Sequence, residues 1–494
     1  MAPSAVATER TWLGHPAGLS TLFFTEMWER FSYYGMRAIL MFFMVAPVAA
    51  GGLGFALKRA GAIYGTYTLC VYLLSIPGGF IGDNFFGPRR SVLGAGVLIA
   101  LGHFTLAFPF EPTFFLGLTL IALGTGLLKP NLSTMVGGLY AANDLRRDAG
   151  FSIYYLGVNL GAFAAPLVTG YLAQSDHWKH VLATHGLDPL HSWHWGFAAA
   201  GVGMTLGLIA YLARGASISG AGLPPPAGAT RPWAKLGLVL GSVALFLGYI
   251  FKSDQSGWEW MRSAYIIVPI GLVLGFGFRR DLDARRIAAV LVFFIAAMVF
   301  WTVFEQAGTT IALFSDRLTR TKVGGWTFPS AWFQSLNALF VILLAPAFAW
   351  LWIKLGDRQP SSPIKFTLGL VFLGSSFVLM VPAARLTALG RVSPLWLVGL
   401  FFLQTLGELC LSPVGLSLMT KLAPPKLIGV VLGVWYLADA LGNKLAGVLA
   451  GQFTTTDPTA LAGFFLRQAG VVGICALVLL GLTPWVRRRM VGVR

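Results

Sequence analysis

The chain has 494 residues, of which 56% are hydrophobic and only 11% are charged, and its mean hydropathy is +0.72. Soluble proteins carry about twice this share of charged residues, so the composition excludes an ordinary soluble enzyme or binding domain. The formal net charge is +17. Because Lys and Arg fall mainly in the connections between apolar runs, we attribute the excess to the anionic face of a lipid bilayer and expect no nucleic-acid partner.

Apolar runs long enough to cross about 30 Å of hydrocarbon recur along nearly the whole chain. The first six spans are expected at residues 19–48, 61–80, 91–108, 113–136, 151–173 and 193–212. A Pro-rich connection follows, and two further spans are expected at 236–251 and 263–278. The last six are expected at 290–314, 331–351, 366–382, 395–419, 427–450 and 462–485.

The predicted fold is therefore an all-α membrane protein of about fourteen spans, with two six-helix bundles and two inserted transmembrane helices. The predicted divisions are tails at 1–18 and 487–494, bundles at 19–213 and 286–486, and an inserted region at 214–285. Lys and Arg gather in cytoplasmic connections. With the N-terminus inside, 21 of the 36 basic residues lie in inner segments and 11 in outer ones, so both termini are expected in the cytoplasm.

No metal site is predicted. The three cysteines, Cys70, Cys410 and Cys475, fall in different spans and match neither a metal motif nor a disulfide framework. Five of the seven histidines lie between residues 177 and 194, where we favour a solvated outer loop over a metal site.

The first predicted span carries ionisable side chains on one helical face. These residues are Glu26, Glu29, Arg30, Tyr33 and Arg37, and each lies three or four positions from at least one other member of the set. This spacing places side chains on the same face of a helix. A charge inside a bilayer costs several kcal/mol unless it faces a cavity or a partner. An ion-pair staple between helices would satisfy these charges, but an apolar residue would pack at a lower free-energy cost, and we therefore favour a water-filled pathway.

Later spans carry further buried charges and amides, namely Lys129, Asn159, Glu305, Asn337, Glu408, Asp439 and Lys444. In the predicted bundles, Arg30, Arg37 and Lys129 belong to the N-terminal half. Glu305 and Glu408 belong to the C-terminal half. A cleft between the bundles would be cationic on one wall and anionic on the other. A short peptide fits this polarity, because a guanidinium can hold its carboxylate and a carboxylate can hold its amino group.

A series of motifs, in order, resembles those of the proton-dependent oligopeptide transporters, the POT family of the major facilitator superfamily. The first is Glu-x-x-Glu-Arg at 26–30, in a matching stretch that runs to residue 40. The others lie at 78–83, 124–131, 154–161, 304–306, 333–337, 360–366 and 407–413. The resemblance covers about residues 19–485 and implies the major facilitator fold, with the two inserted helices of bacterial members.

The resemblance also implies a role for each matching position. Arg30 and Arg37 match residues that receive the peptide carboxylate, with Lys129 near them, and Glu408 matches the acceptor of the amino group. Asn159 and Asn337 match groups that hydrogen-bond the peptide. Glu305 is also counted among the peptide-binding residues, and pocket-lining positions are matched by Tyr33, Tyr34, Tyr72, Trp301, Ser412 and Trp435. Without the family, the aromatic residues in this set would be interpreted as ordinary packing.

Proton coupling requires a carboxylate whose proton affinity changes as the cleft opens and closes. Glu305 is the first candidate, and Glu26 and Glu29 exchanging partners around Arg30 are the second. The resemblance implies that a salt bridge between Lys129 and Glu408 closes the cytoplasmic side. Animal members place a His after the Ile-Tyr of span two, but here Gly65 follows Tyr64, so a histidine coupler is not expected.

We therefore expect a symporter that imports di- and tripeptides with protons by alternating access, and not an enzyme. It should need no cofactor, because the proton gradient drives it, and should be a monomer in a bacterial cytoplasmic (inner) membrane. A family transporter of nitrate or another small solute and a peptide sensor without transport remain as alternatives. A membrane hydrolase is disfavoured, because His-Glu-x-x-His and Gly-x-Ser-x-Gly do not occur.

Overall fold

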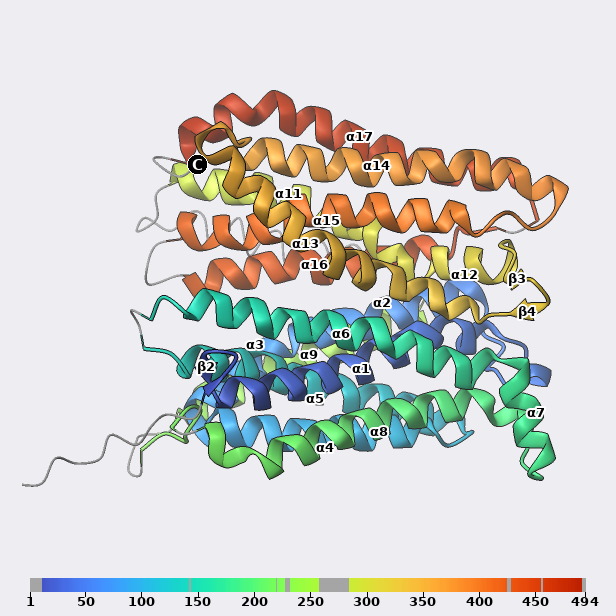
Figure 1. Cartoon of the computed structure of the whole chain (residues 1–494), viewed down its shortest axis with the longest axis horizontal. Helices are drawn as coiled ribbons and strands as arrows, with labels where there is room; N and C mark the ends of the chain where they lie inside the picture. Colours follow the sequence, from blue (N-terminus) through green and yellow to red (C-terminus); the bar gives the residue numbers. More distant parts are fainter. Residues whose placement is uncertain are drawn as a thin grey trace, which may run out of the picture. The chain divides into compact units, whose positions relative to one another are not determined.

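A computed structural model describes residues 11–141, 144–218, 220–226, 232–256, 284–423, 428–454 and 456–490. Within these ranges the chain is almost entirely helical (Figure 1). The longer helices before residue 257 are α1 (Gly18–Val45), α2 (Leu57–Leu73), α4 (Pro88–Leu106), α5 (Glu111–Gly138), α6 (Arg147–Gln174), α8 (Ser192–Ala213) and α9 (Trp233–Ser256). The shorter elements are β1 (Thr11–Trp12), β2 (His15–Pro16), η1 (Val48–Ala50), α3 (Ser75–Ile81), η2 (Gly82–Phe86), α7 (Asp176–Thr184), η3 (Pro189–His191) and η4 (Gly215–Ile218).

The helices after residue 283 follow the same pattern of long apolar segments. They are α11 (Ala284–Phe304), α12 (Thr310–Arg317), α13 (Ser335–Leu355), α14 (Ser362–Leu386), α15 (Leu395–Leu422), α16 (Ile428–Ala450) and α17 (Pro458–Arg489). The shorter elements are η5 (Glu305–Gly308), β3 (Lys322–Val323), β4 (Trp326–Thr327), η6 (Ser330–Gln334), η7 (Gly356–Arg358) and η8 (Thr387–Leu389). The strand pairs β1–β2 and β3–β4 are two-residue antiparallel hairpins.

Thirteen of the fourteen predicted spans coincide with described helices, and the span predicted at 263–278 lies outside the described residues. Two single spans of the prediction are broken. The helix predicted at 61–80 is interrupted at Leu74, between α2 and α3. Pro77 explains this break, because it has no N–H to bond the carbonyl of residue 73. The span predicted at 290–314 is interrupted at Thr309, whose φ of −126° and ψ of −91° are not helical.

The connection predicted as a solvated outer loop between the fifth and sixth spans contains a helix instead. α7 begins after Ser175, whose hydroxyl accepts a hydrogen bond from the backbone N–H of Trp178. This is an N-cap, which satisfies one of the free donors of the first turn. The three-residue η3 follows before α8.

The described chain divides into two compact units that are not contiguous in sequence. Unit 1 contains residues 1–36, 74–169 and 194–243, and unit 2 contains residues 37–73, 170–193 and 244–494. The boundary therefore falls inside α1, after Met36, and α2 belongs with the C-terminal helices. The division predicted at 19–213, 214–285 and 286–486 stays a prediction.

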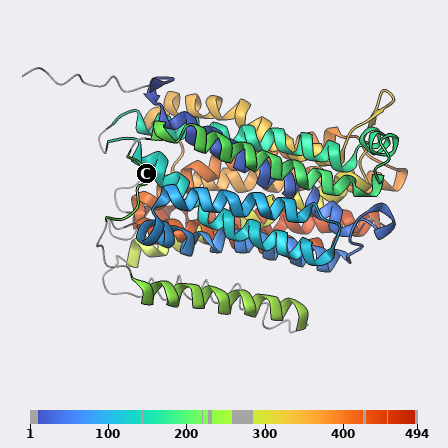
Figure 2. The same cartoon turned by 90° about the horizontal axis from the view of Figure 1, so that it is seen from below.

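Glycines allow close helix packing within each unit. In unit 1, α4 and α5 lie side by side (Figure 1, Figure 2), and a side chain at Gly102 or Gly117 would collide with the facing helix. In unit 2, Gly61 of α2 lies against the backbone of Gly447 of α16. Small residues at such contacts let helix backbones approach closely, which is the usual basis of helix packing in membranes.

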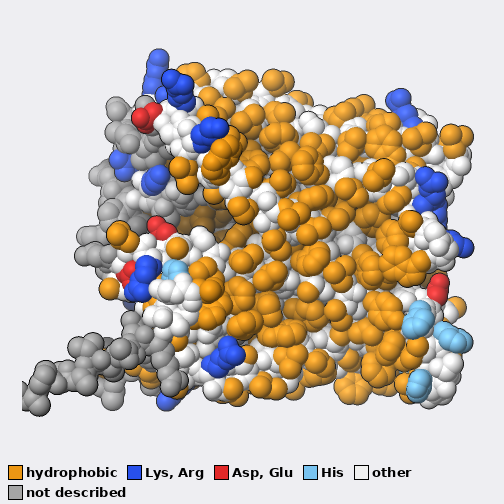
Figure 3. All heavy atoms as spheres, in the orientation of Figure 1, with side chains coloured by type: hydrophobic (Ala, Val, Ile, Leu, Met, Phe, Trp, Pro, Cys, Tyr) orange, Lys and Arg blue, Asp and Glu red, His pale blue; other side chains and the backbone are white. Residues whose placement is uncertain are grey.

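The outer surface of the helices is apolar. Figure 3 shows hydrophobic side chains covering the visible flanks of the helices, with Lys and Arg near helix ends. Nine helical stretches in the described ranges are long and apolar enough to cross a membrane. α1 is not among these nine because it carries Glu26, Glu29, Arg30 and Arg37. α1 thus carries four of the predicted charged site residues within one long helix.

Candidate functional site

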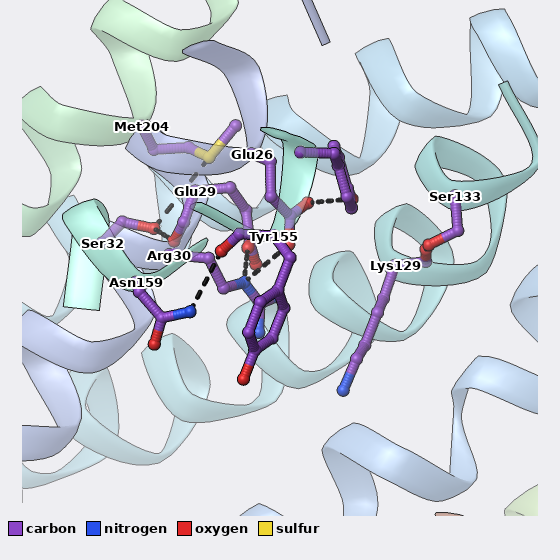
Figure 4. Close-up of polar contacts among 10 residues, drawn as sticks. Glu26, Glu29, Arg30, Ser32, Lys129, Ser133, Tyr155, Asn159 and Met204 are labelled. Atoms are coloured by element: carbon purple, nitrogen blue, oxygen red, sulfur yellow. Dashed lines mark hydrogen bonds and ion pairs between the residues drawn. The ribbon is translucent and has the colours of Figure 1, made fainter. Parts of the chain in front are cut away.

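A buried ion cluster lies on α1 in unit 1 (Figure 4). Arg30 Nε is 3.2 Å from Glu26 Oε1 and also donates to Glu29 Oε2. The three residues are at most 5% exposed. One guanidinium therefore holds two carboxylates from the same helix, the arrangement expected from their spacing along the chain.

Neighbouring aromatic side chains complete this cluster. Tyr154 of α6 donates from its hydroxyl to Glu26 Oε2 at 2.6 Å, and the Arg30 guanidinium lies 5.2 Å from the centre of the Tyr33 ring. Tyr33 in turn contacts Tyr34 edge to face. Glu29 Oε1 and Arg30 Nη2 are buried, and neither has a hydrogen-bond partner among the described residues. The cluster thus retains one acceptor and one donor for a further group.

Lys129 and Asn159 lie near the cluster on α5 and α6, as Figure 4 shows. Lys129 is close enough to interact electrostatically with Glu29. Asn159 is buried and donates to the backbone carbonyl of Tyr155 at 3.0 Å. Unit 1 therefore brings together seven predicted site residues, namely Glu26, Glu29, Arg30, Tyr33, Tyr34, Lys129 and Asn159.

The hydroxyl of Tyr154 is expected to stabilise unit 1. A hydrogen bond to a buried charged group is worth about 1.5–3 kcal/mol, so Tyr154→Phe should lower the free energy of unfolding by that amount. Thermal unfolding of the detergent-solubilised protein would measure it. Tyr171→Phe is the matched control, because the bond from Tyr171 to His177, 2.7 Å long, is exposed. Equal losses in both variants would contradict the role of Tyr154.

A second ion pair lies in unit 2, between Arg37 and Glu305. Arg37 Nη2 donates to Glu305 Oε2, Arg37 Nε donates to the Tyr64 hydroxyl at 2.5 Å, and Nη2 also donates to Asn443 Oδ1 at 3.4 Å. Arg37 and Glu305 are 7% and 8% exposed. The pair joins residues that are 268 positions apart. Both were predicted among the peptide-binding residues, and Glu305 was also the first candidate for proton coupling.

The broken helix after α11 positions Glu305. Glu305 is the first residue of η5, where the chain leaves the regular α-helix of α11. Three residues later, Gly308 lies directly against the Tyr64 hydroxyl, and a side chain at this position would collide with it. Gly308 therefore allows the Tyr64 hydroxyl, which accepts the hydrogen bond from Arg37, to approach η5.

A third polar contact of unit 2 joins Asn337 and Glu408. Asn337 Nδ2 of α13 is 2.9 Å from Glu408 Oε2 and 3.1 Å from Thr405 Oγ1, both on α15. Glu305 is also close enough to interact electrostatically with Glu408. Asn337, predicted to hydrogen-bond the peptide, and Glu408, predicted to accept its amino group, are thus direct neighbours.

The other predicted pocket residues of unit 2 lie in largely apolar surroundings. Tyr72 packs against Leu69 and Ala440, and Trp301 contacts the rings of Phe300 and Phe304. Trp435 contacts Phe366 and lies over Gly415, and Ser412 is half-buried on α15, one turn after Glu408. Ring contacts are present at Trp301 and Trp435, and the pocket-lining role of these residues stays a prediction. Lys129 is in unit 1 and Glu408 in unit 2, so their salt bridge stays a prediction.

Arg37 lies in unit 2 with its partner Glu305. Its predicted place beside Arg30 on the wall of an N-terminal bundle stays a prediction, as does the division into bundles. Tyr154, Tyr64 and Asn443 were not predicted as members of the site. Asn443 had a detectable signal, because it lies one helical turn after Asp439, whose Oδ1 accepts a hydrogen bond from Asn443 Nδ2 at 2.8 Å.

Metal-binding side chains do not gather in the described structure. In the ranges that it covers, no group of three or more His, Cys, Asp or Glu residues is arranged to hold a metal ion. The described polar clusters instead consist of guanidinium, carboxylate, phenol and amide groups.

Comparison with known proteins assigns the family. The model of the POT family matches residues 89–220 and 236–465. The chain is 39% identical over 509 residues to "Peptide transporter YePEPT" of Yersinia enterocolitica subsp. palearctica serotype O:3 (strain YE-P4), covering 97% of this chain and 96% of that protein. It is 38% identical over 496 residues to the "Di-/tripeptide transporter" of Lactococcus lactis subsp. cremoris, covering 96% of each.

A solved structure agrees over the same length. The crystal structure of a mutant of peptide transporter POT in complex with alafosfalin matches with a TM-score of 0.87 and 41% identity, and the match covers 98% of each chain. This confirms the predicted fold class, an all-α membrane protein of the major facilitator type. The chain therefore belongs to the POT family.

Proposed function

We propose that the chain imports di- and tripeptides together with protons by alternating access. The names of the two relatives support peptides as the substrate class. The observation that carries the proposal is the buried pair of Arg37 and Glu305, because it joins a residue suited to a peptide carboxylate with a residue suited to a proton. A buried ion pair is stable only while both partners keep their charge.

Protonation of Glu305 would free Arg37. A neutral carboxyl group no longer forms an ion pair, whereas Tyr64 and Asn443 continue to orient the guanidinium through their hydrogen bonds. A peptide carboxylate could then replace Glu305 as the partner of Arg37, because a guanidinium fork matches carboxylate geometry. Loss of the proton would restore the original pair and displace the peptide. Proton and peptide thus occupy the site together.

Glu408 would hold the other end of the peptide. Glu408 is close enough to Glu305 for their charges to interact, and Asn337 Nδ2 donates a hydrogen bond to Glu408 Oε2 at 2.9 Å. The peptide amino group would add a positive charge between the carboxylates. In unit 1, Arg30 Nη2, which has no hydrogen-bond partner among the described residues, is a second candidate for the carboxylate. Binding to the two termini would tolerate many side chains, since every short peptide carries both.

The remaining features of the proposal follow from transport. The chain would not be an enzyme and would need no cofactor, because the proton gradient supplies the driving force. An inward proton gains about 2.3 kcal/mol per 100 mV of negative-inside potential. We place the protein in the bacterial cytoplasmic membrane as a monomer, with both termini in the cytoplasm. The excess of Lys and Arg in the predicted inner segments supports this orientation.

Competition identifies the substrate class. In proteoliposomes containing the wild-type protein, an excess of unlabelled dialanine, trialanine, nitrate or alanine would be added during uptake of labelled dialanine. We expect the di- and tripeptide to reduce uptake at least tenfold, and nitrate and alanine to leave it unchanged, because both lack a separated amino group and carboxylate. Competition by nitrate alone would indicate another solute, and saturable binding without uptake would indicate a sensor.

A further inference from the structure

The hydrogen-bond network around Arg37 extends to Asp439, a third carboxylate of unit 2 after Glu305 and Glu408. Asn443 of α16 is fully buried, and both ends of its amide are used. Its Oδ1 accepts from Arg37 Nη2 at 3.4 Å, and its Nδ2 donates to Asp439 Oδ1 at 2.8 Å. The orientation of this amide is fixed by its partners, because a guanidinium only donates and a carboxylate only accepts. Asn443 therefore connects Asp439 to the pair of Arg37 and Glu305.

The packing of α16 on α2 holds this connection in place. Gly65 of α2 lies directly against the backbone of Asn443 and Lys444, and a side chain at 65 would collide with it. The residues on either side of Gly65 then contact the network. Tyr64 accepts from Arg37, and the Thr66 hydroxyl is 2.6 Å from the buried ammonium of Lys444. Two charged side chains of α16, Asp439 and Lys444, are thus fixed beside the Arg37 site.

The surrounding ionisable groups show what determines the charge of this network. They are Arg37 from α1, Tyr64, Tyr67, Cys70 and Tyr72 from α2, Glu305 from η5, Glu408 from α15, and Tyr436 and Lys444 from α16. Lys58, Arg59 and Lys421 lie toward the distant ends of α2 and α15. The phenols and the thiol are neutral near pH 7. Among the described residues of unit 2, the charged members of this set are Arg37, Lys444 and the carboxylates of Glu305, Glu408 and Asp439.

A buried carboxylate inside a membrane protein is costly, and a bound proton removes its charge. Glu305 and Asp439 both lie close enough to Glu408 to interact with it electrostatically, and Asn443 joins Asp439 to Arg37 by hydrogen bonds. We propose that Asp439 sets the proton affinity of the Arg37–Glu305 site, acting through Asn443 as a positioning residue that does not itself touch the peptide. This inference rests on the proposed function and adds a residue to it.

The sign of the effect follows from the charge. Asp439→Asn removes a nearby negative charge that favours the protonated form of Glu305, so protonation of Glu305 should require a lower pH. The pH of half-maximal proton-driven dialanine uptake should move about one unit lower. Asp439→Glu keeps the charge and should keep the wild-type pH profile. Lys444→Met removes a positive charge and should move the midpoint in the opposite direction, and the double variant should lie between the two.

The experiment measures two quantities for each variant in proteoliposomes. Proton-driven uptake of dialanine is recorded from pH 5 to 8, and dialanine exchange without a gradient is recorded as a test of folding and binding. Gln404→Leu is the control for loss of a buried polar side chain near the site. Gln404 of α15 is fully buried, and its amide atoms have no hydrogen-bond partner among the described residues. This control should keep the wild-type pH midpoint.

The outcomes separate the inference from the proposed function. An unchanged midpoint in Asp439→Asn, with normal exchange, overturns the inference and leaves peptide transport intact. Shifts of the same sign in Asp439→Asn and Lys444→Met also overturn it, because they would report altered packing rather than charge. If Asp439→Asn does not fold, the sign of the Lys444→Met shift decides. A wild-type protein that neither takes up nor exchanges dialanine overturns the proposed function itself.

Discussion

Replacing Arg37 by alanine is expected to abolish proton-driven peptide uptake, with a loss of at least about 100-fold. Truncating one partner of a buried, hydrogen-bonded charge pair in a complex costs about 2–5 kcal/mol of binding free energy, and each 1.4 kcal/mol corresponds to a factor of ten in affinity. Here Arg37→Ala would leave Glu305 without its guanidinium and remove the donor to Tyr64 and Asn443. It would also remove the proposed partner of the peptide carboxylate, so exchange should be lost with uptake.

Arg391→Ala provides the matched control, because Arg391 is exposed and lies in the connection before α15. It should transport like the wild type. Both variants would be reconstituted at equal amounts and compared for dialanine uptake and exchange. Uptake within threefold of the wild type in Arg37→Ala would show that this residue is not the carboxylate partner, and would transfer that role to Arg30.

Glu305→Gln is expected to separate exchange from accumulation. Glutamine has nearly the shape of a protonated glutamate but cannot bind or release the coupling proton. Arg37 would therefore remain available for a peptide carboxylate at every pH. We expect exchange of dialanine within about threefold of the wild type. Accumulation against a concentration gradient should fall at least tenfold, because each tenfold concentration ratio of peptide requires about 1.4 kcal/mol, which the coupled proton would no longer supply.

The exposed Glu111 at the start of α5 offers the same substitution outside the network. Glu111→Gln should accumulate dialanine normally. Proton-driven accumulation that survives in Glu305→Gln would remove Glu305 from the coupling step. In that case the pair of Glu26 and Glu29 around Arg30 would be the next carboxylates to test, by the same comparison of exchange with accumulation.

The sequence was sufficient to place most helices, because the length and hydropathy of a span are local properties. The described helices match thirteen predicted spans. The two breaks were not predicted, since Pro77 and Thr309 lie within apolar runs that are continuous in composition. Both breaks depend on single hydrogen bonds or torsion angles, which hydropathy does not detect. The break that ends at Thr309 is the more informative, because it begins with η5, whose first residue is Glu305.

The candidate site was only partly predictable for a related reason. The grouping of Glu26, Glu29 and Arg30 follows from helical spacing, and the structure has it. Arg37 shares that spacing but pairs with Glu305, which is 268 positions away, and periodicity gives no information about a partner at that distance. Tyr64, Tyr154 and Asn443 are neutral, and a neutral side chain in a span gives little indication of whether it bonds a charge or packs against apolar neighbours.

The most direct test of coupled transport is the uptake of labelled dialanine into proteoliposomes with an inward proton gradient and a negative-inside potential. Wild-type protein is predicted to concentrate dialanine above its external level, and a protonophore is predicted to abolish this accumulation while leaving exchange intact. Equal uptake with and without the gradient, or no entry of any di- or tripeptide, would contradict the account.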